Sequence, residues 1–188
     1  MGILRPGGVE LTRHALERAG VKAGDKLLDI GCGDGTAAAF VQETMGVKVT
    51  AIDTDETAVA AAKAKGINAL TGDAAMLEFP SRTFDAVLME CVFSVLERQE
   101  ESVHEAFCML KPGGKLILTD VYARQPDMAR YKQEHLAAMK LFYRPRQHSE
   151  CSQEEHFPSP YCQDGAVVLS GLEQLLAELG LKVVIVED

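Results

Sequence analysis

Short apolar runs alternate with helical patterns along most of the chain. The apolar runs are rich in Val, Ile, Leu and Ala and predict strands over 26–30, 47–52, 67–70, 84–91 and 115–121. Apolar residues at helical spacing predict helices over 9–19, 36–45, 55–65 and 96–110. Because strands that alternate with helices are joined by right-handed crossovers, this order predicts an α/β fold: a doubly wound, mostly parallel sheet with helices on both faces.

The alternation stops after residue 121. A helical pattern over 124–143 precedes a polar stretch over 144–165, and a helix over 170–179 and a sixth strand over 182–186 follow. An irregular stretch of that length in a compact domain is usually functional or disordered. We therefore expect a single domain with four parts: a helical cap at 1–23, a ligand-binding core at 24–121, an inserted substrate lid at 124–166, and a closing helix and strand at 170–188.

Composition narrows the class of protein. The 188 residues are 47% hydrophobic, which is typical of one globular domain. Lys and Arg number 19 against 28 Asp and Glu, and a net charge of −9 repels phosphate backbones and anionic lipid, so we expect neither nucleic acid nor membrane as a partner. No run is long enough to span a membrane, and the N-terminus lacks the apolar run of a signal peptide. Five cysteines, an odd number at irregular spacing, favour thiols in a reducing compartment, so we expect a cytoplasmic protein.

The strongest local signal is a glycine-rich turn between the first strand and the helix that follows it. Gly31, Gly33 and Gly35 let the backbone bend sharply and approach a ligand beside the N–H groups of a helix start. A dinucleotide fingerprint would need its third glycine at position 36, which is Thr36. The turn therefore predicts a small nucleotide-like ligand, and favours one other than a nicotinamide dinucleotide.

A second mark lies at the end of the second strand. Asp53 ends the run over 47–52, where a carboxylate can accept both hydroxyl hydrogens of a ribose. Together the turn and Asp53 indicate an adenosyl ligand. The alternatives are that both are only structural, or that the ligand is a nicotinamide dinucleotide.

Four segments carry a resemblance to a known family. They read LDIGCGDGT, AIDTDE, TGDAAMLEFPSRTFDAVLMECV and LKPGGKLILTD, in this order over roughly residues 24–121. In order and spacing they resemble the class I S-adenosylmethionine-dependent methyltransferases. The resemblance implies a Rossmann-like sheet of seven mostly parallel strands, S-adenosyl-L-methionine as cofactor and S-adenosyl-L-homocysteine as product.

The same resemblance implies the cofactor's contacts. Asp53 would hold the ribose, Asp73 and Ala74 would lie near adenine, and Asp29 and the backbone of Gly31 would lie beside the amino-acid moiety. The full set of implied cofactor-binding residues is Arg13, Asp29, Gly31, Cys32, Gly33, Gly35, Asp53, Thr54, Asp73, Ala74 and Glu90.

The chemistry expected at such a site sets the candidate catalytic residues. Methyl transfer from a sulfonium is an in-line displacement that needs alignment and exclusion of water, and a general base only if the acceptor is weakly acidic. Glu90, at the carboxyl edge of the sheet, is the best carboxylate candidate; a cofactor contact or a solvated position is the alternative. Tyr122, just past the fifth strand, could reach an acceptor or only cover the sheet edge. Arg13 would pair with the cofactor's carboxylate, with a solvated helix charge as the alternative.

The polar stretch holds a second group of candidates. His148, Cys151, His156 and Cys162 could together bind zinc, although tight C-x-x-C pairs are missing and such residues are more often scattered through a substrate loop. Cys91 and Cys162 resemble two positions of arsenite methyltransferases, which implies a metalloid acceptor held by thiolates.

The leading expectation is a methyltransferase acting on a small-molecule acceptor, as a monomer or homodimer. A metalloid methyltransferase, a protein methyltransferase and a non-catalytic cofactor-binding partner protein are the alternatives.

Overall fold

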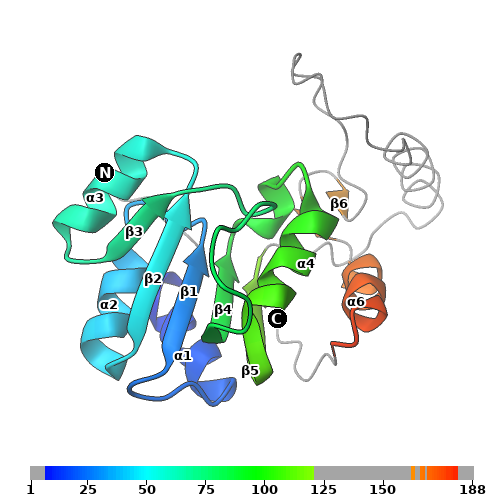
Figure 1. Ribbon diagram of the computed structural model, residues 1–188, viewed down its shortest axis with the longest axis horizontal. Helices are drawn as coiled ribbons and strands as arrows, with labels where there is room; N and C mark the ends of the chain where they lie inside the picture. Colours follow the sequence, from blue (N-terminus) through cyan, green and yellow to red (C-terminus); the bar gives the residue numbers. More distant parts are fainter. Residues whose placement is uncertain (1–6, 121–161, 164–165, 168, 182–188) are drawn as a thin grey trace.

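In the part of the chain that the structure describes, five parallel strands form a sheet at the centre of the molecule (Figure 1). The computed structural model describes residues 7–120, 162–163, 166–167 and 169–181. The strand order is β3-β2-β1-β4-β5. The strands are β1 Lys26–Ile30, β2 Lys48–Asp53, β3 Asn68–Thr71, β4 Phe84–Glu90 and β5 Leu110–Thr119. The doubly wound α/β fold expected from the sequence is confirmed.

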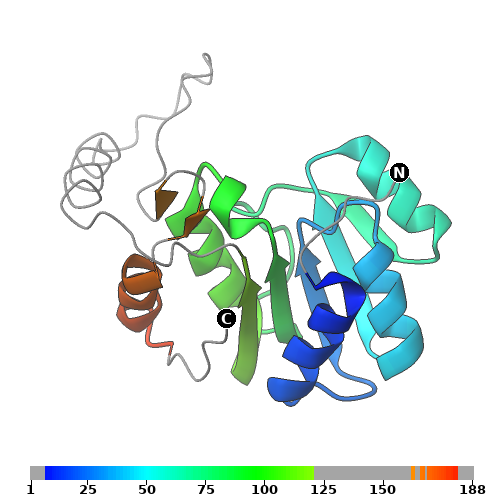
Figure 2. The ribbon, with the colours of Figure 1, turned by 180° about the vertical axis from the view of Figure 1, so that it is seen from behind.

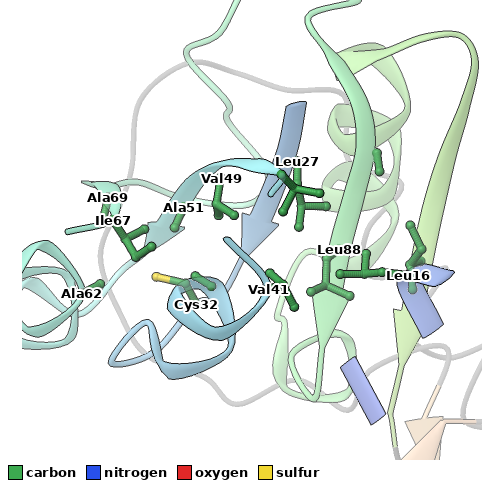
Figure 3. Close-up of a cluster of buried hydrophobic side chains, with 14 of the residues drawn as sticks. Leu16, Leu27, Cys32, Val41, Val49, Ala51, Ala62, Ile67, Ala69 and Leu88 are labelled. Carbon is green, nitrogen blue, oxygen red and sulfur yellow. The ribbon is translucent and has the colours of Figure 1, made fainter. Parts of the chain in front are cut away.

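Helices cover both faces because successive strand residues point to opposite sides. On one face, Leu27 and Leu88 pack with α1, α2 and α3, as Figure 3 shows for part of this cluster. On the other face, Leu28 and Val87 pack against α4. Figures 1 and 2 show these two faces in turn. The described helices are α1 Gly8–Arg18, α2 Thr36–Met45, α3 Glu56–Ala64, the 3-10 turn η1 Phe93–Val95, α4 Gln99–Met109 and α6 Leu169–Glu178.

A two-stranded antiparallel hairpin lies beside η1. It consists of β6 Cys162–Gln163 and β7 Ala166–Val167. Val167 is buried with Phe93 and with Leu172 of α6, so the hairpin packs on the segment that follows β4. The sequence pattern did not predict this hairpin.

The sequence predictions were most accurate around the first crossover. The bounds of β1 and α2 are those predicted, and most other ends differ by one residue. The predicted helix over 96–110 was wrong at its start: the chain first forms η1, and α4 begins only at Gln99. The Gln99 side chain explains this break, since its Nε2 donates to the carbonyl of Phe93 at 2.6 Å. The predicted helix over 124–143 and strand over 182–186 lie outside the described residues.

Candidate functional site

The glycine-rich turn bends where packing leaves no room for side chains. Gly31 has φ +75°, and a Cβ placed on it would lie 2.4 Å from Cγ2 of Val92. Gly35 has φ +72°, and a Cβ there would lie 2.6 Å from Cβ of Ala62 in α3. Gly33, at φ +54°, has no atom within 4 Å of such a Cβ and faces open space. Two glycines are therefore required by their neighbours, and the third leaves the middle of the turn open.

Asp53 fastens this turn to the end of β2. Its Oδ2 accepts the N–H of Gly33 at 2.8 Å, and its Oδ1 accepts the N–H of Asp55 at 3.0 Å. The N–H groups of Gly31 and Cys32 both donate to the carbonyl of Ile52, at 2.9 and 3.0 Å. A carboxylate has about four acceptor positions, so each oxygen of Asp53 keeps one for a ligand hydroxyl.

An ion pair holds the outer side of the turn. The ammonium of Lys65, just after α3, lies 2.7 Å from Oδ2 of Asp34, 2.9 Å from the Asp34 carbonyl and 2.7 Å from the hydroxyl of Thr36. The hydrogen bond from Lys65, together with those from Thr36, lowers the pKa of Asp34 to about 2. The turn is thus fixed from β2 on one side and from α3 on the other.

A hollow of about 320 Å³ opens at the carboxyl edge of the sheet. This is the edge at which ligands bind in open parallel sheets, and its volume is within the usual range for small-molecule sites, about 300–1,000 Å³. The turn, the end of β2 and the segments after β3 and β4 all contribute to its wall. The lining residues are Ile30, Gly31, Ile52, Asp53, Thr54, Gly72, Asp73, Ala74, Cys91, Val92, Val95 and Leu96.

Asp73 stands at the side of the hollow formed by the segment after β3. Its Oδ1 accepts the N–H of Ala75 at 2.8 Å, and its Oδ2 pairs with the guanidinium of Arg98. Both side chains are a little under half exposed. Sequence reasoning missed Leu96 and Arg98, because both fall within the helix predicted over 96–110, and it missed Val95, which lies just before that helix.

Glu90 ends β4 beneath α1 and is 7% exposed. The hydroxyl of Thr12, which is fully buried, donates to its two carboxylate oxygens at 2.9 and 3.1 Å. Glu90 is not among the residues that line the hollow. Its neighbour Cys91 is, and adopts a left-handed backbone conformation with φ +52°.

Arg13 lies on α1 beside Thr12 and pairs within its own helix. Its guanidinium bonds to Glu10 at 2.8 Å and to Glu17 at 2.7 Å, and the three side chains are between 40% and 66% exposed. These bonds, first to Glu10 and then to Glu17, raise the pKa of Arg13. The arrangement matches the alternative of a solvated helix charge, and a contact between Arg13 and the cofactor stays a prediction.

Asp29 and Cys32 are buried outside the hollow. Asp29, in β1, is 3% exposed. The thiol of Cys32 packs in the core with Ala51, Ala62 and Ile67 (Figure 3). Burial, with the charges of Asp29 and Asp53, raises the pKa of Cys32 to about 12. Any contact of Cys32 with a ligand would therefore come from its backbone.

Several of the site residues predicted from the sequence lie in the polar stretch or just past β5. Tyr122, His148, Cys151 and His156 fall outside the described residues. Cys162 begins β6, of which only the backbone is described. Among the residues that are described, no group of three or more His, Cys, Asp or Glu side chains could hold a metal ion. In that same part of the chain, no helix is long and apolar enough to cross a membrane.

The comparisons with known proteins agree with this geometry. Residues 28–118 match a family described as a methyltransferase domain. Phosphoethanolamine N-methyltransferase 1 of Triticum aestivum is 30% identical over 131 residues, which cover 66% of this chain and 26% of that protein. The ubiquinone/menaquinone biosynthesis C-methyltransferase UbiE of Roseobacter denitrificans is 31% identical over 132 residues, or 65% of this chain and 52% of that one. The chain thus spans about a quarter to a half of these relatives.

Solved structures share the fold. The SAM-dependent methyltransferase from Aquifex aeolicus superposes with a TM-score of 0.68 at 21% identity, covering 98% of this chain and 87% of that one. The [4+2]-cyclase SpnF has a TM-score of 0.59 at 29% identity, covering 63% and 46%. Over residues 28–118 the protein belongs to the class I S-adenosylmethionine-dependent methyltransferase superfamily.

A methyltransferase domain of this superfamily implies S-adenosyl-L-methionine as the cofactor, and the residues present fit it. The open middle of the turn at Gly33 gives backbone access, and a Cβ on Gly31 could not be accommodated. Asp53 keeps acceptor positions at the rim of a hollow of sufficient size.

Proposed function

We propose that this protein transfers a methyl group from S-adenosyl-L-methionine to a small-molecule acceptor. The observation that carries the proposal is the joint placement of the glycine-rich turn and Asp53 on one hollow at the carboxyl edge of the sheet. A glycine backbone that a ligand can approach closely is one feature expected of an adenosyl site. A carboxylate that accepts hydrogen bonds from the ribose hydroxyls is the other.

Different residues of the hollow would contact different parts of the cofactor. Asp53, with Thr54 beside it, would hold the ribose hydroxyls, and Asp73 with Ala74 would border the adenine. Gly31 lies toward β4, where the amino-acid part would extend along the turn toward Gly33. The lining of the hollow supports this assignment, since Gly31, Asp53, Asp73 and Ala74 all contribute to its wall.

The bound cofactor supplies the methyl group. The task of the chain is then to align the acceptor and exclude water, because the positive charge of the sulfonium is spread over sulfur, methyl group and acceptor in the transition state. Apolar Val92, Val95 and Leu96 support such a role, since they form the hollow's wall on the side of β4. Glu90 as a general base would require Thr12 to release it, so an acceptor that needs no base suits the described arrangement better.

The relatives support a small molecule as acceptor. One relative is named for phosphoethanolamine, and another is named for ubiquinone/menaquinone biosynthesis. The expected lid at 124–166 would enclose such an acceptor. A cytoplasmic location, a monomeric or homodimeric state and the absence of nucleic-acid or membrane partners rest on the composition and remain part of the proposal.

Binding of S-adenosyl-L-homocysteine, measured by titration calorimetry, tests the cofactor site. We expect binding by the wild-type protein, no binding of NAD, and a loss of at least about tenfold in Asp53→Ala, because hydrogen bonds to charged groups are worth about 1.5–3 kcal/mol. Asp55→Ala is the matched control: Asp55 caps α3 through the N–H of Thr57 at 2.8 Å and does not line the hollow. Binding of NAD with no response to S-adenosyl-L-homocysteine would end the proposal.

Turnover separates an enzyme from a cofactor-binding partner protein. A structure described as a [4+2]-cyclase shares this fold, so the fold alone does not establish methyl transfer. The wild-type protein should convert S-adenosyl-L-methionine to S-adenosyl-L-homocysteine only when an acceptor is present. Amines and quinols are the first acceptors to offer, and an acceptor-dependent product mass increase of one methyl group is the readout.

A metalloid acceptor is the second candidate function, and the position of Cys91 favours it. Cys91 lines the hollow, and the hairpin that begins with Cys162 packs on the segment just after Cys91. Two thiolates would suit a soft trivalent acceptor. Trivalent arsenic should then bind and be methylated by the wild-type protein, whereas Cys91→Ser and Cys162→Ser should abolish both and leave S-adenosyl-L-homocysteine affinity unchanged. Absence of arsenic binding to the parent protein would exclude this candidate.

A further inference from the structure

The chain between β4 and α4 forms a strap across the hollow, defined here as residues 91–98. Its Val92, Val95 and Leu96 line the hollow from the side of β4. Val95 is 74% exposed, so one apolar side chain of the strap stands at the opening. Whatever holds the strap in place therefore shapes the ligand site.

Two carboxylates hold the strap, one at its middle and one at its last residue. At Ser94, the N–H donates to Oδ2 of Asp120 at 2.9 Å and the hydroxyl donates to Oδ1 at 2.8 Å. At Arg98, the guanidinium pairs with Asp73 across the hollow's edge. The first contact ties the strap to the end of β5, and the second ties it to the segment after β3.

The backbone of Arg98 is itself fixed. Its carbonyl accepts the N–H of Ser102 at 3.0 Å and the Ser102 hydroxyl at 2.7 Å, in the first turn of α4. Ser102 is 1% exposed. Arg98 is thus anchored at a helix start, with its side chain reaching to Asp73, and does not itself line the hollow.

Asp73 in turn is held from two directions. Ala75 donates to Oδ1 at 2.8 Å and Arg98 pairs with Oδ2, so the plane of the carboxylate is set by two donors. Each oxygen keeps an acceptor position, and Asp73 lines the hollow. A carboxylate fixed in this way accepts a hydrogen bond from an amino group and repels a carbonyl oxygen.

We propose that Arg98 is a positioning residue that determines nucleobase specificity: it orients Asp73 so that the hollow selects a 6-amino purine over a 6-oxo purine. The inference rests on the proposed function, since it assigns the base end of the same cofactor site. A site that hydrogen-bonds an N–H group of its ligand rejects analogues that lack this group, because the polar groups of the site are then left without a partner.

Titration calorimetry with S-adenosyl-L-homocysteine and S-inosyl-L-homocysteine tests this role. The wild-type protein should prefer the adenosyl compound. In Arg98→Ala, the affinity for S-adenosyl-L-homocysteine should fall about three- to fivefold, the size expected for the loss of a half-exposed ion pair. The preference for the adenosyl compound over the inosyl compound should also shrink. Arg98→Lys, which keeps a cation near Asp73, should restore part of the preference.

Lys111→Ala is the matched control. Lys111 pairs with Asp85 at 2.7 Å with similar exposure, but away from the hollow, so neither affinity nor preference should change. If Arg98 acts through Asp73, then Arg98→Ala should have no further effect on the preference in an Asp73→Ala background. Thermal melting of each variant confirms that it is folded.

Two results overturn the inference, and they differ. If the wild-type protein binds S-adenosyl-L-homocysteine and Arg98→Ala keeps the full affinity and preference, Arg98 has no positioning role, whereas the proposed function stands. If the wild-type protein binds neither nucleoside, the proposed function fails and the inference fails with it.

Discussion

The hydroxyl of Thr12 lies within 3.1 Å of both carboxylate oxygens of Glu90, so a fully buried residue of α1 holds a buried residue at the end of β4. The two residues are 78 positions apart in the chain. This contact makes α1 part of the structure beside the proposed methyl-transfer site.

Removal of the Thr12 hydroxyl should destabilise the fold. Thr12→Val keeps the shape but takes a donor from a buried carboxylate, so we expect the free energy of unfolding to fall by about 1–3 kcal/mol. Thr12→Ser keeps the donor and should lose less. Urea denaturation followed by circular dichroism measures both, and a Val variant as stable as the wild type would contradict the importance of this bond.

A methyl group on Gly31 should disrupt the turn more than one at an unconstrained glycine. Gly31→Ala combines φ +75° with a Cβ placed 2.4 Å from Val92, and we expect it to abolish S-adenosyl-L-homocysteine binding. Gly66→Ala is the control: its φ is +80° and nothing lies within 4 Å of its Cβ. The control should show only the left-handed backbone penalty, about 1–2 kcal/mol, in its melting curve, with affinity unchanged. Equal effects of the two variants on affinity would contradict the packing argument.

The Lys65–Asp34 pair predicts part of the response to acid. The hydrogen bond from Lys65, together with those from Thr36, lowers the pKa of Asp34 from 3.8 to about 2 in the folded protein. The stabilisation is present above pH ~4 and is lost as the pH falls toward ~2, because the unfolded chain takes up the proton first. In Lys65→Met the free energy of unfolding should therefore fall less between these pH values.

Lys63→Met is the control for that experiment. Lys63 lies in the last turn of α3 and is exposed, without an ion pair to Asp34. It should keep the wild-type slope of stability against pH. Parallel slopes for Lys65→Met and the wild type would show that the pair contributes nothing to acid sensitivity.

Cys32 should resist alkylation in the folded protein. Burial, with the charges of Asp29 and Asp53, raises its pKa to about 12, and only the thiolate reacts readily. Iodoacetamide at pH ~8 should leave Cys32 unmodified and label it only in urea, as peptide mapping would show. Cys108 is half-buried and serves as the reference thiol. Labelling of Cys32 at the rate of Cys108 would mean that its core position opens readily.

Some elements of this fold could be predicted from the sequence, and others could not. The bounds of β1 and α2 followed from local patterns alone, because an apolar run, three glycines and an apolar helix face are features of neighbouring residues. Asp53 could be assigned to the same edge as the turn, because parallel strands end together. The start of α4 could not be found, because it depends on a side-chain bond from Gln99 to Phe93 and on Ser94 meeting Asp120.

The sequence by itself therefore determined the class of fold, the bend at Gly31 to Gly35 and the presence of Asp53 beside it. Only the tertiary structure decided that Thr12 covers Glu90, that Cys32 points into the core and that Arg98 meets Asp73. The physical reason is the range of the interactions. Periodicity and backbone conformation are properties of adjacent residues, whereas these contacts join side chains from distant segments that only the folded sheet brings together.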